Sequence, residues 1–212
     1  MKSAMKKHLG SDNKGALILL MALICVLFTF GTQGLFLNTQ NIRNILVSAS
    51  LNGIIGIGMT FVLITGGIDL SVTGNIIMTS LLVSKMMMSG VNWAVCLLAA
   101  LVIGALVGII NGYAIGKFGM VAFVVTMAMN LITTGYGKLF SGGLTLYGFP
   151  EVHGIFCKYL LGIIPGPVIM MAVVAVIASL ILRYTNYGRK LYAVGGNVKA
   201  AWMSGIKTSK VI

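Results

Sequence analysis

The chain has 212 residues, of which 58% are hydrophobic and 8% are charged, and its mean hydropathy is +1.02. A soluble domain carries about 25% charged residues, so this chain lacks the charged side chains needed to cover a surface that faces water. The composition excludes an ordinary soluble domain and predicts a membrane protein that crosses the bilayer several times. The net charge of +12 does not indicate nucleic-acid binding, because the basic residues lie between apolar segments, as they do in membrane proteins.

Six apolar segments are long enough to cross a bilayer, because an α-helix needs about 20 residues to span roughly 30 Å of hydrocarbon. We expect an all-α transmembrane bundle over residues 15–183, with helices at 15–31, 42–65, 71–89, 93–116, 120–140 and 164–183. The first segment follows four lysines, as the apolar part of a signal peptide does, but no small-residue cleavage site follows it directly. We therefore expect an uncleaved first span.

The distribution of the basic residues predicts how the chain is oriented in the membrane. If residues 1–14 lie in the cytoplasm, eleven of the fifteen Lys and Arg residues fall on the cytoplasmic side and four on the other side. Cytoplasmic loops carry an excess of Lys and Arg, so this orientation is favoured. Residues 184–212 then form a cytoplasmic segment. Residues 141–163 form an external loop, in which Glu151 and His153 are expected to be a solvated pair and not a metal site.

Asp69 is one of only three acidic residues in the chain, and it lies between two apolar segments just after Gly66 and Gly67. A carboxylate in the bilayer normally faces a bundle interior, a water-filled cavity or a helix end. The glycines can end one helix here, and Asp69 and Ser71 are good residues to begin the next one. We expect Asp69 to cap the third span. The alternative is that its charge also anchors a hinge or contacts a partner subunit.

Neutral polar residues within the apolar segments form a second candidate set, at Asn52, Thr60, Thr65, Asn75, Asn111, Thr126 and Asn130. Their amides and hydroxyls can line a path for a polyhydroxylated solute by exchanging hydrogen bonds with it. They can equally bridge helices, at under ~2 kcal/mol each, and bridging is the default for any single residue. Because charges are nearly absent from the spans, the set suits an uncharged solute better than an ion or a proton.

Four glycines of the fourth span recur at every fourth position and so lie on one face of the helix, at Gly104, Gly108, Gly112 and Gly116. Glycines on one face let two membrane helices approach closely. We expect tight packing along this face, with a moving helix seam as the functional alternative.

Nucleotide-binding and enzyme motifs are incomplete or missing: the chain has no G-x-x-x-x-G-K-[ST], no H-E-x-x-H and no G-x-S-x-G. We therefore expect a protein that is not an enzyme. If ATP drives transport, another chain must hydrolyse it.

The stretch that follows the sixth span is too polar to cross a membrane and predicts a short cytoplasmic helix. Asn197 is the expected N-cap of this helix, and Gly205 is its expected C-terminal stop. Val198, Ala201 and Trp202 fall on one face at i, i+3 and i+4. Such an amphipathic helix can lie on the membrane surface or dock in a groove of a partner protein.

This stretch resembles the coupling helix of the membrane subunits (permeases) of ribose-type ABC importers, which have the pattern G-R-x-x-Y-A-x-G-G-N-x-x-A-A-x-x-S-G-I. The chain matches that pattern at Gly188, Arg189, Tyr192, Ala193, Gly195, Gly196, Asn197, Ala200, Ala201, Ser204, Gly205 and Ile206. The stretch that contains Gly66, Gly67, Asp69 and Ser71 resembles a signature of the same family. The chain departs from the pattern of the family at Val198, Trp202 and Thr73.

The resemblance implies a permease subunit of an ABC importer for a simple sugar, a ribose-like pentose or a hexose, without a cofactor. It implies a multi-pass protein of the cell inner (plasma) membrane, surrounded by lipid. It also implies three protein partners: an ABC ATPase subunit that docks on the coupling helix, an extracytoplasmic sugar-binding protein, and a second permease subunit that forms a dimer.

The family usually has about ten spans, each of a length that crosses the bilayer, whereas this chain ends directly after the coupling segment. We therefore expect a C-terminally truncated permease, a fragment or a split subunit. Two other hypotheses remain: a secondary transporter and a truncated permease remnant that does not transport. A secondary transporter with inverted repeats predicts a second copy of the Gly66–Ser71 stretch, and the sequence has none.

Overall fold

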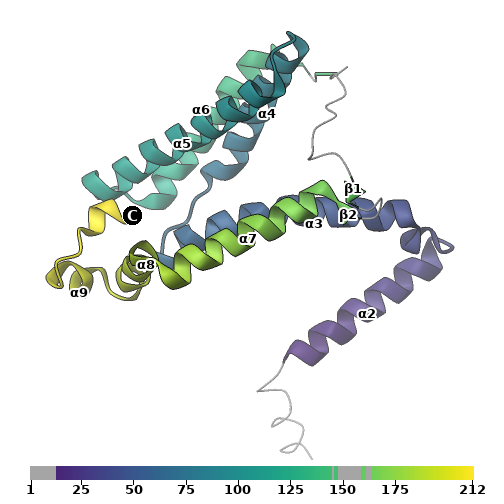
Figure 1. Ribbon diagram of the computed structural model, residues 1–212, viewed down its shortest axis with the longest axis horizontal. Coiled ribbons are helices and arrows are strands. Elements are labelled where there is room, and N and C mark those ends of the chain that lie inside the picture. The colour runs from purple at the N-terminus through teal and green to yellow at the C-terminus, as the bar shows by residue number, and fades with distance from the viewer. Residues whose placement is uncertain (1–12, 145, 148–158, 161–163) are drawn as a thin grey trace, which may run out of the picture. The chain divides into compact units, whose positions relative to one another are not determined.

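The computed structural model describes residues 13–144, 146–147, 159–160 and 164–212. The chain divides into two compact units, Met1–Ala49 and Ser50–Ile212. The helices and strands are α2 (Asn13–Gly31), η1 (Leu35–Leu37), α3 (Thr39–Ile64), α4 (Ser71–Met88), α5 (Trp93–Phe118), α6 (Ala122–Ser141), β1 (Tyr159–Leu160), β2 (Ile164–Pro165), α7 (Gly166–Tyr184), α8 (Asn186–Gly196), α9 (Val198–Met203) and η2 (Thr208–Lys210). Figure 1 shows their arrangement.

The first unit holds α2, η1 and the beginning of α3. The apolar side chains of α2 are mostly exposed, as expected of a helix whose neighbours are lipid chains. The turn after α2 is held by Thr32, whose hydroxyl oxygen accepts a hydrogen bond from the backbone N–H of Phe36 at 3.0 Å. The Asn41 amide donates to the carbonyl oxygen of the same phenylalanine at 2.8 Å, so one polar side chain on each side fixes the turn.

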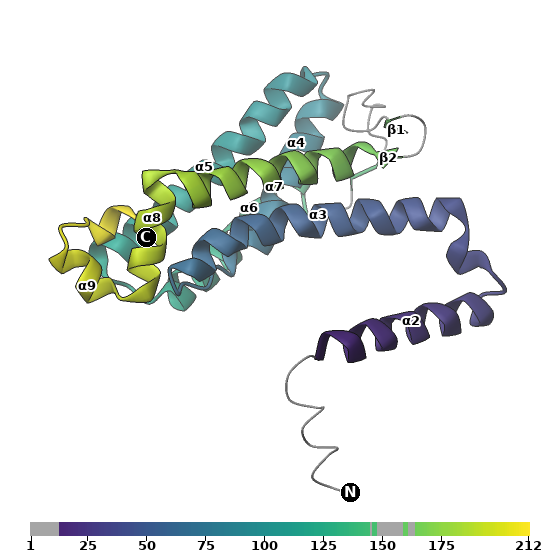
Figure 2. The ribbon, with the colours of Figure 1, turned by 60° about the horizontal axis from the view of Figure 1, so that its bottom comes forward.

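The second unit contains two groups of packed helices. α4 packs against α6 and α5, and α6 also contacts α5. α7 leads into α8, and α8 packs against α9. Figure 2 shows α7 alongside the part of α3 that belongs to this unit, where the side chain of Met171 fills the space beside Gly53.

The helices of the predicted bundle all form at the expected places, which confirms the all-α fold. By length and composition, α3, α5 and α7 are long and apolar enough to cross a membrane among the described helices. α4 and α6, which carry the polar residues Asn75 and Asn130, are not among these three helices.

Two features of the fold were not predicted. The antiparallel pair β1–β2 lies within and just after the predicted external loop. Glu151 and His153 of that loop, and residues 1–12 of the N-terminal segment, lie outside the described residues. The second feature is α8, an amphipathic helix that forms the first part of the predicted coupling element, before the predicted N-cap at Asn197.

α4 and α6 approach each other closely because two glycines face the neighbouring helix. A Cβ atom at Gly74 would overlap the Thr133 hydroxyl and lie 2.7 Å from the Asn130 side-chain oxygen. A Cβ atom at Gly137 would lie 3.0 Å from the Cα atom of Met78. Small residues at such contacts let membrane helices pack backbone against backbone.

A small apolar core joins the C-terminal segment to the ends of α3 and α7. Leu191, Val194, Ala201 and Val211 are buried in it. The half-buried side chains packed against this core are Phe61, Ile64, Leu182 and Ile206. The core fixes α8 and α9 to the helices that cross the membrane.

Candidate functional site

The signature stretch begins where α3 ends, at a turn built around Gly66. Its φ angle of +79° lies in the left-handed region, which glycine adopts without steric cost. The N–H of Gly67 donates to the Val62 carbonyl at 3.2 Å, and the N–H of Gly66 donates to the Leu63 carbonyl at 3.0 Å. These two bonds form a Schellman motif, so the predicted helix break at the glycine pair is confirmed.

Asp69 lies one residue before Leu70, the N-cap position of α4, whose own side chain makes no cap bond, and the Asp69 carboxylate makes the predicted cap contact instead. Its Oδ1 atom accepts hydrogen bonds from the backbone N–H of Ser71 at 2.8 Å and from the Ser71 hydroxyl at 2.6 Å. The backbone N–H groups of a first helical turn lack partners within the helix, and a nearby carboxylate also interacts favourably with the helix dipole. The Asp69 carboxylate thus serves the start of α4 from a position just outside that helix.

The Ser71 side chain links this cap to α5. Ser71 is only 2% exposed, and its hydroxyl oxygen accepts a hydrogen bond from the side-chain amide of Asn111 at 2.9 Å. A chain of hydrogen bonds therefore runs from Asn111 through Ser71 to Asp69. Asn111 is the one side-chain amide in the long apolar helix α5, and it belongs to the polar residues that the sequence predicts to line a path or to bridge helices.

Two residues of α6 hold the same turn from another side. The side-chain amide of Asn130 donates to the Leu70 carbonyl at 2.8 Å. The Thr126 hydroxyl lies 3.3 Å from the Ile68 carbonyl and 2.8 Å from the Ala122 carbonyl of its own helix. We call Asp69, Ser71, Asn111, Thr126 and Asn130 the turn cluster. Through the turn cluster, α5 and α6 are hydrogen-bonded to residues 68–71, which lead into α4.

The other residues predicted to line a path lie in different surroundings. Asn75 lies one turn along α4 from Ser71, beside Gly104, and its Oδ1 atom is buried without a hydrogen-bond partner. The Asn111 Oδ1 atom is also buried without a hydrogen-bond partner. Asn52 is exposed on α3. The Thr60 hydroxyl donates to the Gly56 carbonyl at 2.8 Å. The Thr65 hydroxyl donates to the Val62 carbonyl at 2.7 Å. Of the seven predicted residues, the structure brings Asn111, Thr126 and Asn130 together, and all three bridge a helix to the turn.

The predicted coupling element forms two capped helices. The Thr185 hydroxyl oxygen accepts from the N–H of Gly188 at 3.1 Å and caps α8. The Asn197 Oδ1 atom accepts from the N–H of Ala200 at 3.0 Å and caps α9. α9 ends at Met203 with Ser204 as its C-cap, and the next residue, Gly205, has a φ angle of +81°. The predicted N-cap and C-terminal stop are confirmed.

The predicted apolar face of α9 is wrong in one respect. Ala201 is 4% exposed, whereas Val198 and Trp202 are 46% and 67% exposed. The reason is that α8 and the C-terminal residues pack against a single position of this short helix, so Ala201 turns inward and its neighbours turn outward. The exposed apolar face of α9 consists of Val198, Trp202 and Met203.

Glycines of the coupling element permit close contacts. Gly188 is buried against the Leu182 carbonyl, and Gly195 lies against the Ile64 carbonyl at the end of α3. Residues Gly196, Ala200 and Ser204 are exposed. The Ser204 hydroxyl donates to the Ala200 carbonyl at 3.0 Å.

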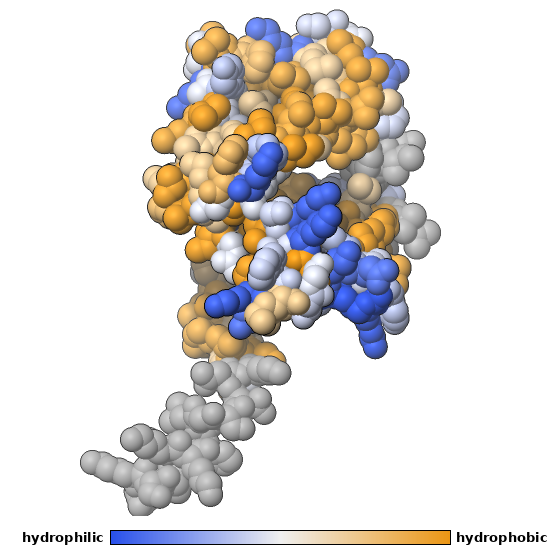
Figure 3. Space-filling view, turned by 90° about the vertical axis from the view of Figure 1, so that its left-hand side faces the viewer, coloured by the Kyte–Doolittle hydropathy of each residue, from blue (hydrophilic) through white to orange (hydrophobic). Residues whose placement is uncertain are grey.

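Basic residues surround this element. Residues 184–212 contain five Lys and Arg residues and no Asp or Glu. Three of these lysines, Lys190, Lys207 and Lys210, line a cavity of about 510 Å³ between α8 and the C-terminal residues. Figure 3 views the end of the molecule at which α8 and α9 lie and shows hydrophilic residues gathered among hydrophobic ones.

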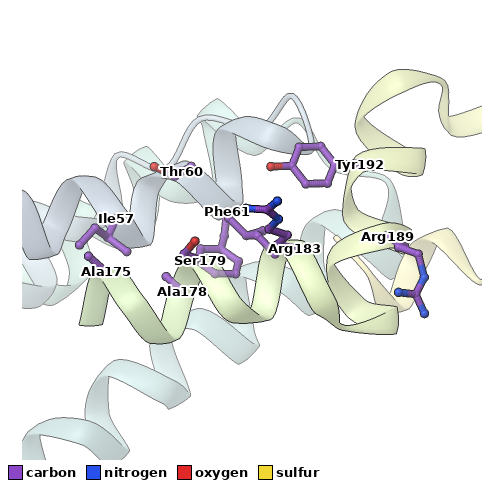
Figure 4. A pocket seen from close by; sticks show the side chains of 10 residues that line it. Ile57, Thr60, Phe61, Ala175, Ala178, Ser179, Arg183, Arg189 and Tyr192 are labelled. Carbon is purple, nitrogen blue, oxygen red and sulfur yellow. The ribbon is translucent and has the colours of Figure 1, made fainter. Parts of the chain in front are cut away.

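A larger cavity, of about 720 Å³, opens between α3, α7 and α8. Its lining includes Thr60 of α3, from the residues predicted to line a path, and Arg189 of α8, from the predicted coupling element. Figure 4 shows the residues that line it.

Apolar helices that bury their few polar side chains against one another define a multi-pass membrane protein. Residues 41–212 match the family model described as the permease component of the branched-chain amino acid transport system. The chain therefore belongs to this family of membrane permeases.

Individual relatives agree with the family match. The ribose import permease of Escherichia coli strain K12 is 34% identical over 200 residues, which are 92% of this chain and 62% of that protein. The ribose import permease of Bacillus subtilis strain 168 is 39% identical over 179 residues, or 83% of this chain and 55% of that protein. The D-allose permease of E. coli strain K12 is 32% identical over 189 residues, or 88% and 58%. The chain thus spans about three fifths of the length of these relatives. No solved structure matches it.

Proposed function

We propose that this chain is the transmembrane permease subunit of an ATP-binding cassette importer for a simple sugar, a ribose-like pentose or a hexose. The observation that carries the proposal is its similarity, over most of its length, to proteins described as ribose, D-allose and xylose permeases. The chain is a transport subunit and not an enzyme, and a separate ATPase subunit hydrolyses ATP. An extracytoplasmic binding protein delivers the sugar, and a second permease subunit completes a dimer.

The chemistry of the turn cluster supports an uncharged solute. Asp69 is the one acidic side chain among the described residues, and it already accepts two hydrogen bonds from Ser71. Pumps for ions or protons use acidic or histidine residues within the membrane, and the described spans offer no second such group. The buried side-chain oxygens of Asn75 and Asn111 remain free to accept hydrogen bonds from hydroxyl groups.

The C-terminal segment supports an ATPase contact on the cytoplasmic side. The exposed apolar residues Val198, Trp202 and Met203 lie on a capped helix that is flanked by lysines, as expected of a helix that docks in a groove of a partner. This contact requires residues 184–212 to lie in the cytoplasm together with the N-terminus. The excess of Lys and Arg residues on that side favours the same orientation.

The test is sugar uptake by proteoliposomes that contain the purified chain, the ATPase subunit encoded beside it and the matching sugar-binding protein. We expect accumulation of one of the labelled sugars ribose, allose, xylose or galactose, only when ATP is enclosed with the ATPase. Accumulation that follows a proton gradient without ATP would indicate a secondary transporter. No accumulation of any sugar, with all subunits assembled, would indicate a remnant that does not transport.

A further inference from the structure

The cavity between α3, α7 and α8 has one apolar end and one polar end. Ile57 of α3 and Ala175 and Ala178 of α7 line the apolar end. Arg183 of α7 and Tyr192 of α8 line the other end. Its volume of about 720 Å³ lies within the usual range of roughly 300–1,000 Å³ for small-molecule sites. The lining therefore fits a ligand that is itself apolar at one end and polar at the other.

Arg183 lies near the C-terminal end of α7, an apolar helix that is long enough to cross a membrane. It is in the last turn of α7, where a cation interacts favourably with the helix dipole. Figure 4 shows its side chain beside Phe61, with the Tyr192 hydroxyl turned toward the same space. Arg189 of α8 also lines the cavity, and its guanidinium donates a hydrogen bond to the Asn186 side chain. The polar end of the cavity is therefore formed by two guanidinium groups, those of Arg183 and Arg189, and by the Tyr192 hydroxyl, and of the two guanidinium groups that of Arg189 is already hydrogen-bonded to a side chain.

The charge of Arg183 has no counter-charge within the described residues. Asp69 is the one acidic side chain there, and its Oδ1 atom is engaged by Ser71. An arginine does not lose its proton in a protein, so its charge must be balanced by an anion from outside the described residues or by water. Membrane proteins bind anionic lipid head groups in basic pockets between transmembrane helices. A basic residue beside an apolar cavity at a helix end has this arrangement.

We propose that this cavity binds an anionic phospholipid. The phosphate of the lipid accepts hydrogen bonds from the Arg183 guanidinium, which presents two parallel N–H groups, and from the Tyr192 hydroxyl. One acyl chain lies along the apolar wall formed by α3 and α7. The Arg183 guanidinium lies over the Tyr184 ring, 5.5 Å from its centroid, but a ring does not neutralise its charge. Charge complementarity favours this occupant over an apolar helix of another protein, since such a helix would cover the guanidinium without supplying a counter-charge.

Native mass spectrometry of the full chain in detergent tests the proposal. The chain is titrated with phosphatidylglycerol and with phosphatidylcholine that carry the same acyl chains. We expect phosphatidylglycerol to bind at least about fivefold more tightly, since each basic side chain near an anionic lipid contributes about 1 kcal/mol. Arg183→Gln should remove this preference, and Arg183→Lys should retain it.

Two further measurements identify the occupant. Lys117→Gln is the matched control, because it removes one positive charge from the end of α5, where Lys117 contacts Tyr113 and not this cavity, and it should leave the preference unchanged. Ala175→Phe fills the apolar end and should weaken the binding of both lipids. Equal binding of the two lipids by the unmodified chain would overturn the proposal. Glycerol 3-phosphate binding as tightly as the lipid would also overturn it, because the site would then be a plain phosphate site.

Discussion

The Asp69 carboxylate lies 2.8 Å from the backbone nitrogen of Ser71 and 2.6 Å from its hydroxyl oxygen, so a single oxygen atom accepts both donors. This pair joins the turn after α3 to the first turn of α4. The same hydroxyl accepts the side-chain amide of Asn111, so a change at either residue of the pair reaches α5.

Asp69→Asn removes the negative charge of residue 69 and keeps a side-chain oxygen that can accept the cap hydrogen bonds. An asparagine side-chain oxygen can accept the same two hydrogen bonds, so we expect an unchanged midpoint of thermal unfolding in detergent. Asp69→Ala removes the acceptor and should lower the free energy of unfolding by about 1 kcal/mol. We also expect the asparagine variant to retain uptake in the assembled transporter. Loss of uptake at normal membrane levels would show that the charge itself is required.

Ser71→Ala should destabilise the second unit by about 1–3 kcal/mol, because it leaves the buried amide of Asn111 without an acceptor. Thermal unfolding of Ser71→Ala, Asn111→Leu and the double variant measures the coupling between the two residues. We expect the double variant to be more stable than the sum of the single changes indicates. Ser80→Ala, on an exposed part of α4, is the control and should change little. Strictly additive effects would mean that the 2.9 Å bond contributes nothing.

Gly74→Ala should destabilise the α4–α6 contact by about 1–3 kcal/mol, because the new methyl group would overlap Thr133. Gly108→Ala in α5 is the matched control. No atom lies within 4 Å of a Cβ atom built there. Alanine is the better helix former by about 1 kcal/mol, so the control should be neutral or stabilising. Both free energies of unfolding come from denaturation in mixed micelles. The reverse order of stability would contradict the close packing of α4 on α6.

Cysteine labelling tests the proposed ATPase contact at two adjacent positions of α9. Ala200 is exposed and Ala201 is buried. In a background in which the native cysteines are serines, we expect Ala200→Cys to react with a water-soluble maleimide in the isolated chain and Ala201→Cys to react much more slowly. Adding the ATPase subunit should protect Ala200→Cys. Undiminished labelling in the assembled complex would exclude docking at this face.

The orientation is tested by labelling intact spheroplasts from outside in the same background. Tyr147→Cys lies in the predicted external loop, and Lys199→Cys lies in the predicted cytoplasmic segment, and both positions are exposed. We expect the impermeant reagent to label Tyr147→Cys at once and Lys199→Cys only after lysis. The opposite result would reverse the topology.

The positions of the helices and of the cap at Asp69 could be predicted because they depend on local features of the sequence. Apolar length locates a span, a glycine pair ends it, and an Asp beside a Ser begins the next helix. The same reasoning located the ends of α9 at Asn197 and Gly205. In each case the hydrogen bonds that matter join residues fewer than six positions apart.

The packing between helices could not be predicted in the same way. The regular glycine row of α5 predicted tight helix packing. Gly108 has open space beside it, and Gly116 instead receives the backbone of Ser209. The close contact uses Gly74 and Gly137, which lie on different helices and form no periodic pattern. Likewise Ala201 is buried and Trp202 exposed because of where α8 packs, which depends on residues outside α9.

The two backbone contacts of the C-terminal segment have a mechanical consequence. Gly195 of α8 lies against the last carbonyl of α3, and Gly116 of α5 lies against the carbonyl of Ser209. Neither contact contains a side chain that can bend and absorb a displacement. A force applied to α9 is therefore delivered to the end of α3, two residues before Gly66. The turn at residues 65–70 is then the first place where the chain can yield.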